Sequence, residues 1–367
     1  MNSSISGSNR RAPAGCDVRL AWRHWLTIFC GTFFGLSALL FALLLLIDPY
    51  DTGRFPGFGL VGIGDNTTRT ADASRGRDPQ FNAAVIGSST GQLLDPYRLS
   101  REAGFRFAQL TIAATGPQEQ LILMRWVISH HSQYGAFVVV TDPLWCSSDP
   151  DLPLSRPFPF WLYGSDLDYL AHLLSSRSLD RAAWRIEIAL GIRKPADPVG
   201  YFNYMNQVKH AFVPGPPGPS ARIDSDHWSL PSLPWVDRLR AFLADLPQSV
   251  RVVIAMPPVY FTLLPQPGSK QAADLDACKA ALAKIVSDRQ GSGFLDFRLD
   301  TEAAHDAVRF ADALHSGEGL ARQMEDAIIA VLRSDEVGIN PSHRTTPQSG
   351  QYGRRSWRAQ PVMDAIP

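Results

Sequence analysis

The chain has 367 residues, of which 45% are apolar and 19% charged, with equal numbers of basic and acidic residues. This length and composition suit one or two folded domains and exclude a disordered chain or a coiled coil. A net charge of zero lacks the basic field with which nucleic-acid-binding proteins attract phosphates, and four cysteines without a C-x-x-C pair argue against a disulfide scaffold or a structural zinc site.

An apolar segment near the N-terminus, residues 25–47, contains no charged residue. About twenty such residues cross the hydrocarbon core of a bilayer. A cleaved signal peptide would have a shorter apolar region that ends in a small-x-small site, whereas this segment ends in four leucines and an isoleucine. We therefore predict an uncleaved transmembrane anchor.

The charges that flank this segment predict its orientation. The flanking charged residues are Arg10, Arg11, Arg19 and Arg23 before the segment and Asp48 and Asp51 after it. Because basic residues stay on the cytoplasmic side, we expect residues 1–24 in the cytoplasm and the C-terminal bulk outside, in the periplasm of a Gram-negative cell. Cys146 and Cys278 then share an oxidising compartment in which they could pair, but the sequence does not determine whether they meet.

The rest of the chain alternates between strand and helix patterns. Residues 48–80 are rich in Gly, Asp, Thr and Arg and are predicted to form a linker. Short apolar runs predict strands at 83–87, 105–111, 136–141, 250–256 and 294–297, and several are continuously apolar, as in parallel sheets. Amphipathic patterns predict helices at 118–132, 235–246, 272–288 and 319–332. The alternation predicts an α/β three-layer sandwich with a five-stranded parallel, flavodoxin-like sheet, preceded by one transmembrane helix.

Two segments depart from this alternation. Between about 143 and 249 the chain is rich in aromatic residues and proline, and we expect a partly helical insertion over the carboxyl edge of the sheet, or a flap with its own aromatic packing. Residues 334–367 are polar without an apolar period and are predicted to be a disordered tail. The α/β domain should therefore span 81–333.

A serine follows the first predicted strand, in the run Gly87-Ser88-Ser89. A side chain directly after a buried strand lies at the carboxyl edge of the sheet, and Gly87 allows the backbone to turn sharply there. Serine and glycine are also ordinary turn residues, so this signal alone is weak.

The second signal is Asp312-x-x-His315, directly before the last predicted helix. An aspartate three residues before a histidine can accept the Nδ1 proton and leave Nε2 as a base. Such pairs also occur by chance, but this pair and Ser89 are expected at the same edge of the sheet. We therefore predict Ser89 as nucleophile, His315 as base and Asp312 as the residue that orients it.

Over residues 82–333 the sequence resembles the SGNH, or GDSL-like, hydrolase superfamily, as a membrane-anchored bacterial member. The Gly-Ser-Ser run that ends at Ser89 stands where the family has Gly-Asp-Ser, and Asp312 and His315 match its final Asp-x-x-His. Gly116 resembles the glycine of the second block, which implies that its N–H binds an oxyanion. The resemblance also implies a five-stranded parallel sheet and a link to acyl groups on cell-envelope polysaccharides.

One block departs from the family pattern. The family usually carries Gly-x-Asn-Asp after the third strand, and its Asn donates to the oxyanion, whereas this chain has Thr141-Asp142-Pro143 there. An aspartate carboxylate cannot donate, although the Thr141 hydroxyl could. Loss of one oxyanion donor lowers rates by about 10²–10³ in other enzymes. Asn203 and Asn206 in the insertion are possible substitutes.

Other interpretations of these residues are open. The run from Gly87 to Gly91 also fits Gly-x-Ser-x-Gly, the nucleophile elbow of α/β-hydrolases, but that fold needs several strands before the elbow. Asp224 and His227 repeat the Asp-x-x-His spacing as a weak alternative, and His130, His131 and His305 lack such a setting. No zinc-ligand spacing occurs, and we expect no metal and no cofactor.

The residues and the resemblance together predict a serine esterase or O-acyltransferase that acts on acyl esters of cell-envelope carbohydrate. The expected partners are inner-membrane lipid and an envelope polysaccharide or acylated carbohydrate, with no nucleic acid; no protein partner is indicated. The alternative is a non-catalytic SGNH-like binding or assembly component of envelope polysaccharide machinery. The unusual third block favours the alternative, and the intact Ser, Asp and His disfavour it.

Overall fold

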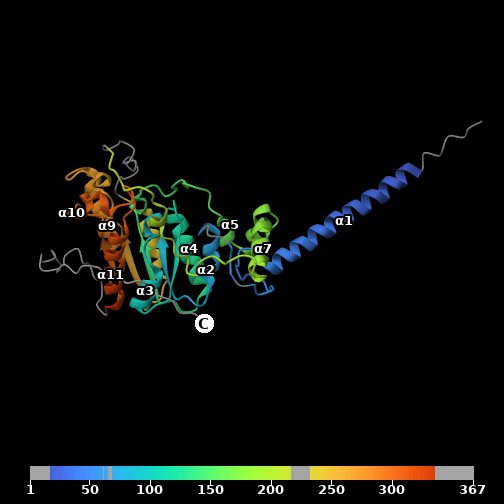
Figure 1. Ribbon diagram of the computed structural model, residues 1–367, viewed down its shortest axis with the longest axis horizontal. Helices are drawn as coiled ribbons and strands as arrows, with labels where there is room; N and C mark the ends of the chain where they lie inside the picture. Colours follow the sequence, from blue (N-terminus) through green and yellow to red (C-terminus); the bar gives the residue numbers. More distant parts are fainter. Residues whose placement is uncertain (1–16, 61, 65–67, 216–231, 335–367) are drawn as a thin grey trace, which may run out of the picture.

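A computed structural model describes residues 17–60, 62–64, 68–215 and 232–334. A long helix, α1 (Asp17–Ile47), projects from one end of an α/β domain (Figure 1). Within it, Trp22–Ile47 is long and apolar enough to cross a membrane. Residues 335–367 of the tail predicted at 334–367 lie outside the described residues, as do the first sixteen residues and the pair Asp224 and His227.

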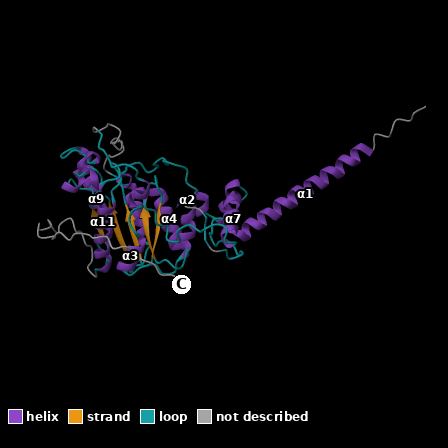
Figure 2. Ribbon diagram, viewed as in Figure 1, coloured by secondary structure: helices purple, strands orange, loops and turns teal. Residues whose placement is uncertain are grey.

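Five parallel strands form the single sheet of the described residues. They are β1 (Ala83–Gly87), β2 (Phe107–Thr111), β3 (Ala136–Val140), β4 (Arg251–Met256) and β5 (Gly293–Asp296). Their order in space is β2-β1-β3-β4-β5, the flavodoxin-like order. The strands lie between helices (Figure 2), so the predicted three-layer sandwich is confirmed.

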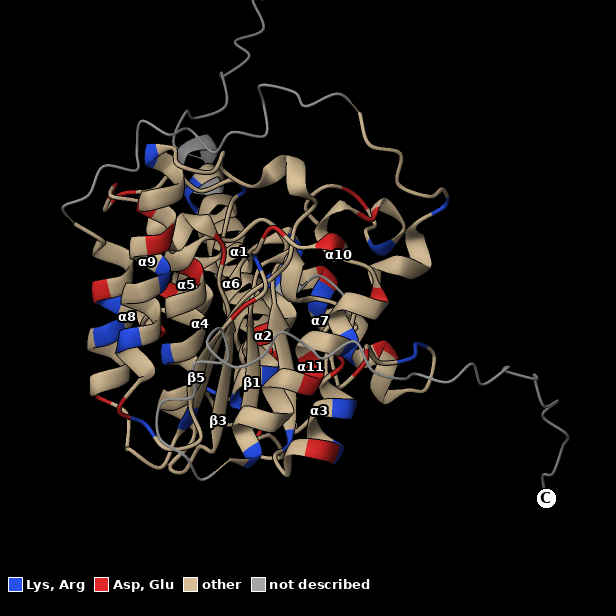
Figure 3. Ribbon diagram, turned by 90° about the vertical axis from the view of Figure 1, so that its left-hand side faces the viewer, with Lys and Arg blue, Asp and Glu red and all other residues tan. Residues whose placement is uncertain are grey.

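Helices cover both faces of the sheet. They are α3 (Pro96–Ala103), α4 (Pro117–His130), α8 (Pro234–Ala244), α9 (Lys270–Val286) and α11 (Glu318–Arg333). Because successive strand residues point to opposite faces, Ile86 packs in one core cluster with α4, α8 and α9, and Val85 packs in another with α3 and α11. On the outer surface of α3 and α11 basic and acidic residues are mixed (Figure 3). Between the two helices, Arg98 pairs with the buried Glu325 at 2.8 Å.

Further helices and turns complete the described chain. The α-helices are α2 (Thr68–Arg77), α5 (Phe160–Tyr163), α6 (Asp166–Leu173), α7 (Ser176–Ala189) and α10 (Glu302–His305). The 3₁₀ turns are η1 (Ser89–Gly91), η2 (Pro143–Cys146), η3 (Tyr204–Gln207), η6 (Phe261–Leu263) and η7 (Ala307–Arg309). The segment predicted as a linker thus contains α2, which packs on α4 and β2.

The insertion between β3 and β4 divides into two parts. Its helices α6 and α7 contact the end of α1, far from the edge where we expected them (Figure 1). A later part turns back to the sheet, where the carbonyl of Val199 accepts a hydrogen bond from the N–H of Gln109 in β2. Among the described residues of the insertion, this later part lies along the edge strand β2, and its Tyr204 in η3 packs on His315.

Cys146 and Cys278, whose pairing the sequence does not determine, meet in the structure. The two residues form a disulfide with their Cα atoms 5.6 Å apart, joining η2 to α9. Both are buried in the core cluster that α4, α8 and α9 form on the sheet. The bond closes a loop between residues 132 positions apart, which contains the part of the insertion that follows Cys146.

Loss of this disulfide should reduce stability strongly. A cross-link over a loop of this length lowers the entropy of the unfolded chain, and we expect Cys278→Ser to lower the free energy of unfolding by about 3–5 kcal/mol. Denaturant unfolding of the full chain in detergent micelles measures the change. Cys30→Ser, which removes a free cysteine in α1, is the matched control and should leave the unfolding midpoint unchanged. Equal midpoints for both variants would contradict the prediction.

Candidate active site

Ser89 lies at the carboxyl edge of the sheet, directly after β1. Gly87 is level with Val140 of β3, and a Cβ at Gly87 would stand only 2.9 Å from the Cβ of Val140, so a side chain does not fit there. The close approach lets the chain leave the strand and begin η1 at Ser89, which is half-buried. The fold therefore presents the Ser89 hydroxyl at the edge where open α/β sheets bind ligands.

His315 and Asp312 come from the C-terminal part of the domain sequence and lie beside this serine. The Nε2 atom of His315 lies 2.8 Å from Ser89 Oγ, although the residues are 226 positions apart. The Nδ1 atom lies 2.8 Å from Oδ2 and 3.0 Å from Oδ1 of Asp312. Because Nδ1 faces two acceptor oxygens it carries the proton, and Nε2 is left to accept the hydrogen of the Ser89 hydroxyl. The structure thus brings the three predicted residues into one hydrogen-bonded chain.

Asp312 is itself held in place by the backbone. Its Oδ1 accepts the N–H groups of Leu314 at 2.8 Å and of His315 at 2.9 Å. Partial burial acts to raise the pKa of Asp312, but the hydrogen bond and charge of His315 outweigh it and lower the pKa overall. The carboxylate is therefore kept in the charged form that orients an imidazole and stabilises it when protonated.

The insertion contributes a residue that the sequence analysis did not predict. The rings of Tyr204 and His315 pack edge to face, with their centroids 5.4 Å apart. The Tyr204 hydroxyl donates to the carbonyl of Ser316 at 2.7 Å. The carbonyl of His315 accepts the N–H of Ala311 at 2.8 Å, which closes the loop around the imidazole. Tyr204 was one of many aromatic residues in its segment, and no local signal distinguished it.

Gly116, the predicted oxyanion donor, directly precedes α4 as its N-cap residue, and its N–H donates to Glu119 Oε2 at 3.0 Å. The pair forms a capping box, in which the third helical residue reaches back to the residue before the helix. Burial raises the pKa of Glu119 above its usual range. An oxyanion would have to displace this carboxyl from the Gly116 N–H. The Gly-x-x-Glu spacing before an apolar helix is a readable signal that the sequence analysis missed.

Ser89 has a backbone N–H of its own at the start of η1. It is the first residue of η1, and the N–H of a first helical residue has no partner within its own helix. This N–H adjoins the predicted nucleophile, so a substrate oxygen attached to the attacked carbon would lie near it.

Thr141 and Asp142, which stand where the resembled family has its Asn-Asp block, make contacts within the fold. Thr141 is fully buried, and its hydroxyl is directed at the carbonyl of Ala255 in β4, 3.4 Å away. Asp142 accepts the N–H of Leu144 at 2.9 Å and so caps η2. Burial raises the pKa of Asp142 to about 6, against the opposing effect of the Arg298 guanidinium. Only in its protonated form does Asp142 offer a donor.

The remaining described candidates bond to other residues or are exposed. Asn203 donates to Glu318 at 2.8 Å, and Asn206 is exposed. His305 forms a separate pair with Asp300 at 2.6 Å. Among the described residues, no group of three or more His, Cys, Asp or Glu side chains is arranged to hold a metal ion.

Compared with protein-family models and with curated protein sequences, the chain has no match. The geometry around Ser89 alone therefore indicates what chemistry these residues can perform. The side chain of His315 is 22% exposed and that of Asp312 is 56% exposed, so a substrate can approach the three residues from solvent. A serine, an imidazole with an unprotonated Nε2 and an ionised carboxylate, hydrogen-bonded in that order, can carry out nucleophilic acyl transfer.

Proposed function

We propose that the chain is a membrane-anchored SGNH-like serine esterase or O-acyltransferase that acts on acyl esters of cell-envelope carbohydrate. The observation that carries the proposal is the 2.8 Å distance from His315 Nε2 to Ser89 Oγ, with Asp312 bound to the opposite ring nitrogen. Hydrogen-bond reach between nucleophile and base, with a third group orienting the base, is the geometry that such catalysis requires.

The proposed reaction begins as His315 Nε2 takes the proton of the Ser89 hydroxyl. Oγ attacks the acyl carbonyl carbon, and the N–H of Ser89, joined by that of Gly116 once Glu119 is displaced, stabilises the oxyanion. The imidazolium returns its proton to the departing alcohol as the C–O bond breaks, leaving an acyl-Ser89 ester. Water or a sugar hydroxyl, whose proton His315 Nε2 takes, then attacks the acyl carbon of this ester. The bond from that carbon to Oγ breaks, and the imidazolium returns the proton to Ser89 Oγ.

The proposed location is the inner membrane, with the domain on the periplasmic side. Two features support it. The last turns of α1 are packed into the domain, where Leu44 is 1% exposed and contacts a cluster that includes Leu162 and Tyr169, so removal of α1 would uncover this core. The disulfide of Cys146 and Cys278 suits an oxidising compartment.

The alternative function is a non-catalytic SGNH-like binding or assembly component. It is favoured by Gly116, whose N–H already has an acceptor in Glu119, and by Thr141, whose hydroxyl is directed into the sheet. A binding component needs no oxyanion donors. It would leave the Ser89 hydroxyl unreactive.

A fluorophosphonate probe separates the two functions. Such a reagent phosphonylates only an activated serine, and we expect stoichiometric labelling of the full chain in detergent, with the adduct on the Ser89 peptide by mass spectrometry. Ser89→Ala should abolish labelling, whereas Ser88→Ala, which changes the adjacent serine, should retain it. A folded wild-type chain that takes up no probe would favour the binding component.

A further inference from the structure

Helix α7 lies across the end of the domain from which α1 projects (Figure 1). It contacts α1 directly, as does α6. Three of its large apolar side chains are nevertheless turned to solvent: Leu179 is 43% exposed, Ile186 is 41% exposed and Leu190, at the helix end, is 67% exposed. We call these three residues the α7 stripe.

The stripe is a continuous feature of one side of the helix. Positions 179, 186 and 190 are separated by seven and four residues, so they lie one above another along α7. The position between them on the same side is Ala183, which is also exposed. A helix that packs only against its own domain turns such a row inward, so this row indicates a second apolar contact.

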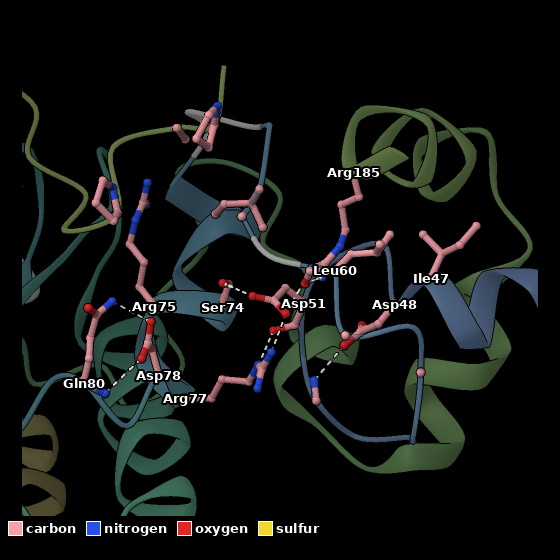
Figure 4. A pocket seen from close by; sticks show the side chains of 18 of the residues that line it. Ile47, Asp48, Asp51, Leu60, Ser74, Arg75, Arg77, Asp78, Gln80 and Arg185 are labelled. Atoms are coloured by element: carbon pink, nitrogen blue, oxygen red, sulfur yellow. Dashed lines mark hydrogen bonds and ion pairs between the residues drawn. The ribbon is translucent and has the colours of Figure 1, made fainter. Parts of the chain in front are cut away.

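A different side of α7 attaches the helix to the domain. Arg185 is almost fully buried and projects into a cavity of about 540 Å³ beside the end of α1 (Figure 4). Its guanidinium donates to the carbonyl of Leu60, and its Nη1 lies 3.0 Å from Oδ1 of Asp51. Ser178 on the same side bonds the hydroxyl of Tyr50 at 3.2 Å. These contacts fix the rotation of α7 and hold the stripe away from the domain.

The end of α1 indicates where a bilayer would meet α7. Leu44 is buried in the domain, and Phe41 and Leu45 pack against the same cluster. From Trp25 to Leu44 there are twenty residues, which at about 1.5 Å per residue span the hydrocarbon thickness of about 30 Å. The hydrocarbon boundary therefore falls at the turns of α1 that reach the domain, and α7 lies beside them.

We infer that the α7 stripe is a second membrane contact, inserted at the boundary between headgroups and acyl chains of the leaflet next to the domain. The inference rests on the proposed anchoring of the chain by α1.

The contact has a consequence for the site. A single helix would leave the domain free to tilt and rotate above the membrane, whereas α1 together with the α7 stripe fixes the plane of the bilayer relative to the sheet. The carboxyl edge with Ser89 is then held at one height and one orientation, which suits a substrate presented by an envelope of fixed geometry.

Spin labels on the full chain in phosphatidylethanolamine–phosphatidylglycerol vesicles test the inference. Labels are placed by Ile186→Cys and Leu190→Cys, in a background with Cys16→Ser and Cys30→Ser that keeps the disulfide. Collision with oxygen and with a water-soluble nickel chelate is measured. We expect labels at both positions to collide more often with oxygen than with the chelate. Their ratio of the two collision rates should approach that of a Phe34→Cys label inside α1.

The matched control is Val308→Cys, an exposed apolar position in η7 (88%) that should favour the chelate. Chelate access at 186 and 190 equal to that at Val308 would overturn the inference. Protection from both reagents with dipolar broadening, as a second copy of the chain would cause, would also overturn it. A label at Phe34 that meets the chelate would refute the anchor itself, and fluorophosphonate labelling of Ser89 is independent of all these outcomes.

Discussion

Replacing His315 with alanine is expected to lower kcat for an acyl ester by about 10⁶-fold, because nucleophile and base act as one unit. Without Nε2 at 2.8 Å from Oγ, the Ser89 hydroxyl keeps its proton and remains a weak nucleophile. Ser89→Ala should cause the same loss, and the double variant should be no slower than either single one. Hydrolysis of a chromogenic acetyl ester by the full chain measures the three rates.

The chain carries its own control for this experiment. His305 also pairs with an aspartate, with its Nε2 2.6 Å from Asp300, and lies ten residues before His315. Because it has no serine partner, His305→Ala should retain the wild-type rate. A His315→Ala variant that is as active as His305→Ala, with an unchanged unfolding midpoint, would refute the proposed base.

The sheet could be predicted from the sequence because its strands are buried on both faces. The strands β1, β3 and β4 are continuous apolar runs, and their predicted limits agree with the observed ones to within a residue. The helix α2 could not be predicted, since its buried side contains small and charged residues. Asp72 and Arg75 pair there at 3.1 Å, and burial raises the pKa of Asp72 to about 7. No apolar period marks a helix of this kind.

The insertion illustrates a different limit of sequence reasoning. Its aromatic residues indicate packing, but they do not indicate against what. Tyr204 packs on His315, whereas Tyr169 packs in the cluster that receives the end of α1. The two residues belong to one aromatic-rich segment and serve opposite ends of the domain. Only the path of the chain between α7 and η3 separates these roles.

The candidate site was predictable where it depends on topology and not where it depends on local contacts. Ser89 follows the first strand and His315 precedes the last helix, and in a parallel sheet both places meet at the carboxyl edge. By contrast, the acceptor on the Gly116 N–H is Glu119, one turn away, and the Thr141 hydroxyl is directed at a neighbouring strand. These contacts decide how many of the proposed oxyanion donors are free of other partners.

The carboxylate of Asp312 should have the second-largest effect on the reaction. We expect Asp312→Asn to lower kcat by about 10⁴-fold, the loss typical of an amide that favours the wrong tautomer of the histidine. The amide can donate to Nδ1, which moves the imidazole proton to Nε2. A protonated Nε2 cannot accept the hydrogen of Ser89. Steady-state kinetics on the same acetyl ester measures the change, with KM expected to stay near the wild-type value.

Stability and rate should separate in this variant. Asp312 is 56% exposed, and an asparagine oxygen can still accept the N–H groups of Leu314 and His315, so the unfolding midpoint should move little. The matched control is Asp300→Asn, which changes the carboxylate beside His305 and should keep the wild-type rate. Fluorophosphonate labelling of Ser89 should slow in parallel with kcat, because both need the free Nε2. A variant at Asp312 that labels as fast as the wild type would show that the carboxylate orients nothing in the reaction, and Ser89 and His315 would then act as a dyad.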